Sequence, residues 1–369
     1  MTNYTIKKLF GNRHDATQAD GPPAPGPLID AWTAFANKIL AGEVTGTGRE
    51  LLVTCRLSMI SKGSGNRFRP ICMDCCAYRA IGATSVVAAR AHLPSMQPLQ
   101  FGGGIRNSAE IVARANALAN DQDKAILSID IKNAFNTTRL SIIHDRLLQA
   151  DPTLLHYFRW RYRNPSTLRD NTGATVATTR TGVRQGDPWG SLLFEIAIQP
   201  SLRCLQAHLT HLEEEHNAEH PHDNIQSSGS VAAFEDDTQA RSDPTIIFQL
   251  APLIKDIFAI DGFTVDESKC KITGAGITTL PNDAPHGFEI QESGTTALGI
   301  PIGNEHFRTA TTRSKMEAMA PPLAALRLLT PRSAILLLSQ CICHRPGFLL
   351  KTASDLALKD LRREDLPRG

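Results

Sequence analysis

Three carboxylates stand side by side in the stretch SVAAFEDDTQA, at Glu235, Asp236 and Asp237. They follow a short apolar run that is typical of a β-strand, and adjacent anions repel one another unless a cation lies between them. Another acid, Asp130, comes near the end of a second β-like run, KAILSIDI (124–131). If the two strands are neighbours in one sheet, Asp130 and Asp236 converge, and Mg²⁺ is the cation that suits such hard oxygen ligands.

Two magnesium ions about 3.5–4 Å apart would clamp the attacking and leaving oxygens of an in-line phosphoryl transfer. One ion would lower the pKa of a nucleic-acid 3′-hydroxyl, and the other would neutralise the triphosphate of an incoming nucleotide. An acidic surface turn is the alternative, because Asp side chains commonly bond the local backbone in turns. From the two adjacent aspartates alone, the surface turn is the favoured interpretation.

Composition limits the class of protein. The chain has 369 residues, of which 41% are hydrophobic and 21% charged, as in soluble globular proteins with two or three subdomains. A net charge of +2 means that any basic groove must come from local clustering. We expect no membrane span, no secretion signal and no disulfide scaffold, and hence an intracellular protein of the nucleus or cytoplasm with no readable targeting signal.

The elements that must position the acids alternate without the regular rhythm of a doubly wound sheet. This order predicts an α+β fold with helices on one side of an antiparallel sheet. Ser108 is the expected N-cap of a helix within 104–120. The expected strands lie at 50–60, 67–71, 124–131, within 170–183, around the acidic hairpin, at 269–277 and at 296–303. The expected helices lie at 28–42, 71–93, 139–150, 190–209, 246–263 and through the last sixty or so residues.

Five stretches of the chain, in order, resemble the palm motifs of reverse transcriptases. They are LSIDIKNAFNTTRL (127–140), GVRQGDPWGSLLF (182–194), AAFEDDTQA (232–240), GFTVDESKCK (262–271) and LGIPIG (298–303). Upstream, RFRPI (67–71) and QPLQFGGGIRNSAE (97–110) resemble the fingers motifs of the non-LTR retrotransposon enzymes. The resemblance extends from about Ala34 to the C-terminus.

The resemblance implies a role for each acid. Asp130, Asp236 and Asp237 would be the catalytic carboxylates, with Asp130 and Asp236 as the main metal ligands. The backbone carbonyl of Ile131 would complete the shell of one metal ion. Lys269 matches the late-palm lysine that could protonate the pyrophosphate leaving group.

The same resemblance implies a set of residues for nucleotide and template binding. An aromatic ring beneath the incoming sugar would exclude a 2′-hydroxyl, a glycine lets a backbone approach a base pair, and guanidinium forks suit phosphates. The residues that match these positions are Arg67, Arg69, Phe135, Gln185, Gly186 and Pro188.

The implied architecture is a right-hand polymerase with an antiparallel-sheet palm backed by helices, fingers and a short helical thumb. The expected boundaries are a flexible arm at 1–33, fingers at 34–125, palm at 126–303 with 139–180 partly in the fingers, and an apparently truncated helical thumb at 304–369. The implied activity is RNA-directed DNA polymerisation with two Mg²⁺ ions, for which Mn²⁺ could substitute. The expected partners are an RNA template, a DNA primer, deoxynucleoside triphosphates and, because no endonuclease is visible, an endonuclease-bearing polypeptide in trans.

Other interpretations stay open. Relatives usually have a small or apolar residue where Glu235 stands, so an impaired relative that binds RNA as a scaffold is the main alternative. A group II intron protein and a nucleotidyl cyclase are others, and the RQGDP segment counts against the cyclase. The cysteine clusters CMDCC (72–76) and CICH (341–344) are interpreted as buried cysteines rather than zinc ligands.

Overall fold

A computed structural model describes residues 27–61, 68–222, 225, 229–274, 277, 285, 287–343, 347, 349–351 and 353. The chain forms two compact units, and each has its own β-sheets. One unit comprises residues 1–96 and 133–198, and the other comprises residues 97–132 and 199–369.

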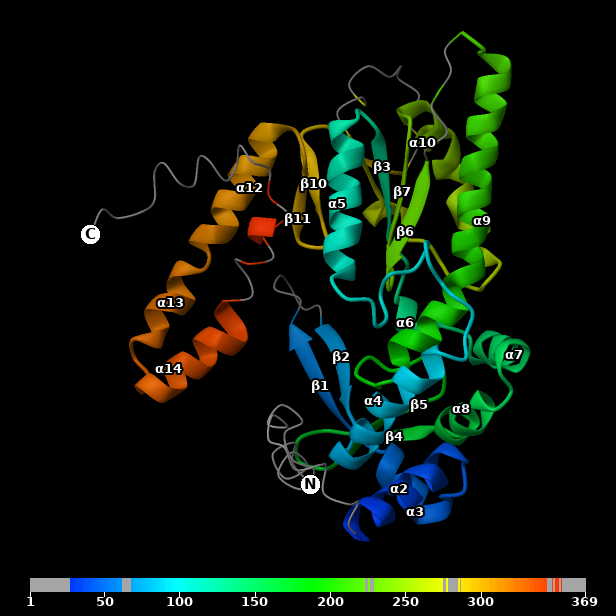
Figure 1. Ribbon diagram of the computed structural model, residues 1–369, viewed down its shortest axis with the longest axis vertical. Coiled ribbons are helices and arrows are strands. Elements are labelled where there is room, and N and C mark those ends of the chain that lie inside the picture. The colour runs from blue at the N-terminus through cyan, green and yellow to red at the C-terminus, as the bar shows by residue number, and fades with distance from the viewer. Residues whose placement is uncertain are drawn as a thin grey trace, which may run out of the picture. The chain divides into compact units, whose positions relative to one another are not determined.

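The second unit is built on a five-stranded sheet in the order β6-β7-β3-β8-β9 (Figure 1). All neighbouring strands run antiparallel except β8 and β9, which are parallel. The strands are β3 (Ala125–Ile129), β6 (Ser230–Phe234), β7 (Asp237–Ser242), β8 (Lys271–Thr273) and β9 (Glu289–Gln291).

The central strand β3 is covered on both of its faces. Ile126 and Leu127 point to opposite faces of the sheet, and both are 0% exposed. Ile126 packs with Ala119 of α5 (Ser108–Asp121), and with Ala297 of β10 (Gly294–Ala297) and Ile302 of β11 (Ile300–Gly303). A strand buried on both faces needs a continuous apolar run, which KAILSI supplies. The strand that ends at Asp130 is therefore rigidly held.

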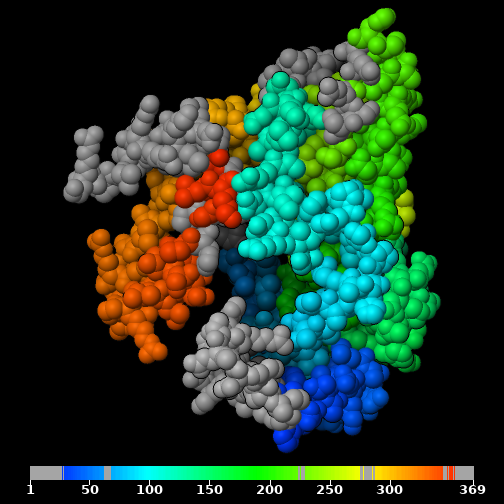
Figure 2. Space-filling view, viewed as in Figure 1, coloured from blue at the N-terminus to red at the C-terminus, as the bar shows by residue number. Residues whose placement is uncertain are grey.

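Helices complete this unit. The outward surface of α5, teal in Figure 2, stays open to solvent, and Leu118 on that helix is 59% exposed. The remaining elements are β10 (Gly294–Ala297), β11 (Ile300–Gly303), α10 (Pro244–Leu250), η1 (Ala251–Leu253), α11 (Ile254–Ala259), η2 (Glu267–Lys269), α12 (Glu305–Glu317), α13 (Ala320–Leu326), α14 (Pro331–Leu337) and η4 (Leu338–Ile342).

The first unit has a four-stranded sheet in the order β2-β1-β4-β5, in which only β1 and β4 are parallel. The strands are β1 (Cys55–Ser61), β2 (Phe68–Met73), β4 (Ser166–Arg169) and β5 (Thr175–Thr179). The helices are α2 (Pro27–Leu40), α3 (Gly46–Val53), α4 (Cys76–Arg90), α6 (Ala134–Thr137), α7 (Leu140–Ala150), α8 (Leu154–Tyr162) and α9 (Gly190–Glu219), which continues into the second unit.

The predicted α+β class is confirmed, with three differences in detail. The expected strand at 50–60 begins only at Cys55, because the preceding residues end α3. Asn107 rather than Ser108 is the N-cap of α5, and only β5 forms within 170–183. Among the described residues, no helix has the length and apolar character needed to span a membrane.

Candidate active site

Asp130 lies at the end of the central strand, next to the acidic hairpin. In the antiparallel pairing of β3 with β7, Ile129 is opposite Thr238, and β7 begins one residue earlier, at Asp237. One further step along this register brings Asp130 beside Asp237. Opposed residues of antiparallel strands have Cα atoms about 4.5–5.5 Å apart and share a face of the sheet. The sequence-predicted acids therefore gather at one end of one sheet.

The hairpin between β6 and β7 closes with a strained two-residue turn. Phe234 pairs with Asp237, so Glu235 and Asp236 form the turn. Glu235 has a φ of 55°, and Asp236 is not among the residues with positive φ. A positive φ at the first central position alone is the pattern of a type II′ turn, where glycine is preferred. A non-glycine residue in this region costs about 1 kcal/mol, so other contacts must hold this turn.

Gln100 supplies those contacts. Its buried side chain accepts a hydrogen bond from the Glu235 N–H (3.0 Å) and donates one to the Glu235 carbonyl (3.1 Å). The backbone beside Gln100 bonds the strand before the turn: Leu99 accepts from the Ala233 N–H (2.7 Å), and Phe101 donates to the Ala233 carbonyl (2.8 Å). The segment 99–101 thus holds the end of β6 and its turn in place.

Lys269 reaches the same end of the sheet from the segment before β8. Its Nζ lies 3.6 Å from Asp130 Oδ1 and forms a closer ion pair with Asp266. Asp266 also donates its backbone N–H to the Asp130 carbonyl (2.9 Å). The hydrogen bond to Asp266 and the attraction of Asp130 outweigh desolvation and raise the pKa of Lys269. The ammonium is therefore kept protonated close to Asp130.

The backbone carbonyl of Ile131 points to the side of the strand on which β7 and the acidic hairpin lie. Ile131 pairs with Val265 in an isolated antiparallel bridge. The hydrogen bonds of this bridge are made by its neighbours, including one from the Lys132 N–H to the Thr264 carbonyl (2.8 Å). In such a pair, the N–H and C=O of Ile131 point away from Val265.

The chemistry and exposure of Asp130, Asp236 and Asp237 show whether they could bind the Mg²⁺ that the sequence predicts. Among the described residues, no three His, Cys, Asp or Glu side chains are close enough to form a ready-made metal site. Mg²⁺ typically binds one or two protein carboxylates and completes its shell with water and substrate phosphates. The side chain of Asp130 is 43% exposed, and Asp236 and Asp237 are also within reach of solvent. The donor chemistry therefore fits Mg²⁺.

The cysteine clusters add no further metal candidate within the described residues. Cys72 is buried, and Cys75 caps α4 by accepting from the Tyr78 N–H. Cys341 and Cys343 are exposed, so the expectation that they are buried is wrong, because the last helices leave their apolar faces open.

In the first unit, the loop 182–189 lies against strand β2, which carries the exposed Arg69. The Cys72 N–H donates to the Gln185 carbonyl (2.8 Å). Gly186 has a φ of 102°, and a Cβ at this position would lie 2.2 Å from the Cys72 carbonyl oxygen. Only glycine fits this approach. The sequence-predicted residues Gln185, Gly186 and the half-buried Pro188 are thus fixed beside the strand of Arg69.

Phe135 joins the same cluster through the backbone. Its carbonyl accepts a hydrogen bond from the Val183 N–H (2.8 Å), which ties α6 to the start of the loop. The Phe135 ring stacks on Phe194 with centroids 4.7 Å apart, and the residue is 7% exposed. Only a small part of this residue is open to a ligand.

A buried ionic network stabilises the loop 182–189 from inside. The fully buried Arg161 of α8 forms ion pairs with Asp74 (3.0 Å) and Asp187 (2.8 Å). Asp187 also accepts hydrogen bonds from the hydroxyls of Tyr78 (3.1 Å) and Tyr162 (2.9 Å). Breaking a buried ion pair by removing one partner is strongly destabilising, so this network fixes the position of the loop.

The pKa of Asp74 is unusually high for a carboxyl group in an ion pair. Burial raises the pKa of Asp74 to about 7, which the opposing attraction of Arg161 does not cancel. The nearby Asp187 adds to the upward shift. Arg161, facing both acids, keeps its positive charge, since its pKa lies well above the usual value.

The comparison with protein families decides the classification. The family model described as reverse transcriptase (RNA-dependent DNA polymerase) matches residues 60–302, well over half of the chain. The chain belongs to the reverse transcriptase family. The match includes the strand of Asp130, the loop 182–189, the acidic hairpin and Lys269.

The other comparisons add little to this family assignment. No curated protein matches the chain. Among solved structures, the telomerase from Candida tropicalis in complex with the TWJ fragment of telomeric RNA matches with 9% identity and a TM-score of 0.43. The alignment covers 74% of this chain and 47% of the telomerase chain, so this chain spans less than half the length of the telomerase. A TM-score this low gives no support for a shared activity.

Sequence patterns predicted most of the candidate residues of this chain, but not the residues that hold them in place. The structure brings Asp130, Asp236, Asp237 and Lys269 together in one unit, and it brings the loop 182–189 beside Phe135 and the strand of Arg69 in the other. Arg67 lies outside the described residues. Gln100, Arg161, Asp74 and Asp187 were missed, and a signal for Arg161 was its place between aromatic residues in the helix LLHYFRWRY.

Proposed function

We propose that this chain is an RNA-directed DNA polymerase, which adds deoxynucleotides to the 3′-hydroxyl of a primer on an RNA template. The observation that carries the proposal is the register of β3 with β7, which sets Asp130 beside the tip that holds Asp236 and Asp237. Membership of the reverse transcriptase family supports the reaction class.

Divalent cations held by Asp130, Asp236 and the Ile131 carbonyl would activate the 3′-hydroxyl and neutralise the triphosphate. The chain's own residues then position the reaction. Asp130 and Asp237 supply negative charge at one end of the sheet, and the strand β3 is too well packed to shift. Mg²⁺ is the proposed cation, with Mn²⁺ as a substitute.

Lys269 is the proposed general acid of the reaction. Its ammonium is protonated at neutral pH, as lysine ordinarily is, and the hydrogen bond to Asp266 and the attraction of Asp130 raise its pKa further. A protonated group within 3.6 Å of a catalytic carboxylate can deliver a proton to the leaving pyrophosphate. The side chain is about half exposed, which leaves it room to reorient toward a bound nucleotide.

The other sequence-predicted residues would bind nucleotide and template. Gln185, Gly186 and Pro188 would present the surface of their loop to a base pair, while the missing Cβ of Gly186 lets that loop pack against Cys72. Arg69 would offer its exposed guanidinium to phosphate. The exposed edge of Phe135 would act against the nucleotide 2′ position.

The proposed boundaries place the fingers at 34–125, the palm at 126–303 with part of the fingers at 139–180, and a helical thumb from 304 onward. The proposed branch is the non-LTR retrotransposon type, on the strength of RFRPI and QPLQFGGGIRNSAE. The second of these motifs carries Gln100, which gives it a structural role in this chain.

The experiment is primer extension with the purified chain, an RNA template, a DNA primer and Mg²⁺. We expect deoxynucleotide addition, with ribonucleotides strongly disfavoured. Phe135→Val should relax this sugar selectivity, while Phe194→Leu, beneath it, should not. Extension that needs no template, or that uses ribonucleotides equally well, would contradict the proposal.

A second candidate is a catalytically impaired relative that binds RNA as a scaffold. The observation that favours it is the carboxylate of Glu235 at the hairpin tip, where an anion repels a nucleic-acid backbone. RNA binding without any extension, in the wild type and in Glu235→Ala alike, would select this candidate.

A further inference from the structure

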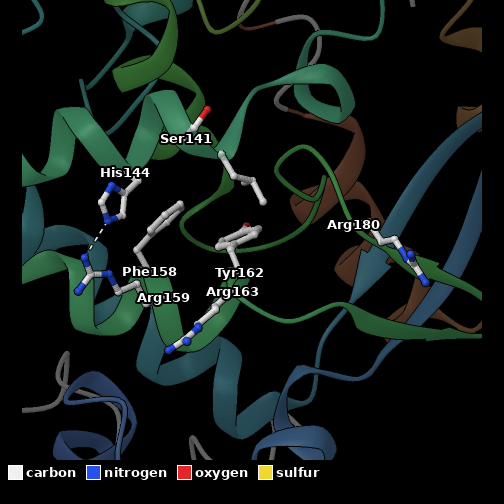
Figure 3. A pocket seen from close by; sticks show the side chains of 8 residues that line it. Ser141, His144, Phe158, Arg159, Tyr162, Arg163 and Arg180 are labelled. Carbon is white, nitrogen blue, oxygen red and sulfur yellow. Dashed lines mark hydrogen bonds between the residues drawn. The ribbon is translucent and has the colours of Figure 1, made fainter.

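A pocket in the first unit takes no part in the proposed function. It has a volume of about 580 Å³ and lies between α7, α8 and the residue that follows β5 (Figure 3). Its lining comes from residues 140–144, 158–163 and 180, all within one compact unit. The volume falls in the range of pockets that hold small ligands, about 300–1,000 Å³.

The charge of this pocket has a single sign. Arg159, Arg163 and Arg180 line it, all three are exposed, and no lining residue is a carboxylate. Guanidinium groups without a competing acid in the lining favour phosphate over cations or basic peptides. The ligand should therefore be an anion with several oxygen acceptors.

One of these arginines is held in place by a short chain of polar contacts. Arg159 Nη2 lies 2.8 Å from His144 Nε2 (Figure 3). His144 Nδ1 in turn lies 3.1 Å from Asp145 Oδ1. With the proton on Nδ1, the imidazole donates to Asp145 and accepts from Arg159. Asp145 is outside the pocket lining, so it orients the guanidinium without repelling an anion in the pocket.

Aromatic side chains form the inner wall of the pocket. The rings of Phe158 and Tyr162 are stacked, with centroids 5.5 Å apart and an angle of 28°. The Tyr162 hydroxyl donates to the buried Asp187, so its ring cannot turn freely. A fixed aromatic surface beside arginines is the combination with which proteins bind bases and phosphates of single strands.

We propose that this pocket binds a nucleotide unit of single-stranded nucleic acid, with the base against Tyr162 and the phosphates on Arg163 and Arg180. The pocket gives affinity without reading sequence, because stacking accepts every base. The pocket lining contains none of the candidate active-site residues. Binding of the nucleic acid to this pocket needs neither a metal ion nor a nucleoside triphosphate. The proposal therefore stands or falls independently of polymerase activity.

The test measures binding of a fluorescein-labelled uridine decamer by anisotropy, without Mg²⁺ or nucleotides. The double variant Arg163→Gln/Arg180→Gln should lower the affinity roughly tenfold and lessen the slope of log K against log salt by about 1.4, which is two lost phosphate contacts at about 0.7 each. The control Arg169→Gln/Arg203→Gln, with the same charge change at exposed residues outside the lining, should stay within twofold of wild type.

A second readout locates the contact. A decamer carrying 4-thiouridine should form a photocrosslink within α8 in the wild type and lose it in Arg163→Gln/Arg180→Gln. Equal affinity loss in both double variants, or a crosslink map that omits α8, would overturn the proposal. Competition by inorganic phosphate as strong as by uridine monophosphate would also overturn it, because it would show a simple anion site.

Discussion

The side-chain amide of Gln100 holds the backbone of Glu235 at both its N–H and its carbonyl, at 3.0 and 3.1 Å. Gln100 is 2% exposed, so neither bond competes with water. The turn it holds has a glutamate at a φ of 55° and carries Asp236. A residue 135 positions away in the chain thus sets the conformation of the acidic tip.

Gln100→Met tests this relationship, because methionine keeps the volume and removes the two hydrogen bonds to Glu235, together with those that the side chain accepts from the Phe101 and Gly102 N–H groups. We expect kcat for primer extension to fall about tenfold or more and the free energy of unfolding to fall by about 2–4 kcal/mol, roughly 0.5–1 for each bond. The KM for deoxynucleotides should change little, since these bonds all go to backbone groups of the turn and of the segment next to Gln100. The exposed Gln149→Met is the control, and full-rate extension by a folded Gln100→Met would show that the contact has no catalytic role.

Substitutions of Glu235 separate charge from strain. Glu235→Gln and Glu235→Ala remove the anion and should raise the extension rate several-fold, because repulsion of the primer backbone is relieved. Glu235→Gly also removes the strain of the positive φ and should alone stabilise the fold, by about 0.5–1 kcal/mol. Chemical denaturation and extension assays on the three variants provide both readouts. Unchanged extension in all three would remove the concern that Glu235 impairs activity.

The two parts of the candidate site differ in how far the sequence could predict them. The strand before Asp130 and the acidic hairpin were predictable, because an unbroken apolar run and a paired turn are local signals. The bonds of Gln100 and Arg161 were not, since they join segments far apart in the chain. The end of α3 was misread as a strand because the helix runs directly into the β-formers Val53 and Thr54. In the structure, Arg49 anchors that helix to the Trp160 carbonyl (2.7 Å).

The raised pKa of Asp74 predicts a pH-dependent stability. Its folded pKa of about 7 exceeds its unfolded value of 3.8, so the folded state binds the proton more tightly. The contribution to stability is full below the unfolded pKa and is lost as pH rises through about 7. Asp74→Asn should therefore flatten the fall in the free energy of unfolding between pH 5 and 7. The slope that it removes is at most on the order of 1.4 kcal/mol per pH unit.

Urea midpoints at pH 5, 6, 7 and 8 provide the measurement. The exposed Asp145→Asn serves as control and should keep the wild-type slope. If Asp74→Asn and the wild type lose stability in parallel over this range, Asp74 is not the titrating group.

Lys269 is tested through its pH profile. Lys269→Ala should lower kcat by roughly 10²-fold, the range for loss of a general acid. Deprotonation of Lys269 should give the wild type an alkaline limb that lies above the ordinary lysine pKa, because the pKa of Lys269 is raised, and the variant should lack that limb. Lys271→Ala, two residues along and paired with Glu289, is the control. An alkaline limb that persists in Lys269→Ala would assign the proton to another group.

The most direct test of the shared role of Asp130 and Asp236 is single-turnover primer extension by Asp130→Asn, Asp236→Asn and the control Asp123→Asn. Asp123 lies in the turn before β3 with a φ of 57°, which asparagine accepts as readily as aspartate. We predict that the wild type and Asp123→Asn extend the primer at equal rates and that each of the other variants is slower by about 10²–10³-fold, the range for loss of one electrostatic group in an active site. Extension by Asp236→Asn or Asp130→Asn at the rate of Asp123→Asn would contradict the assignment of the sheet end as the active site.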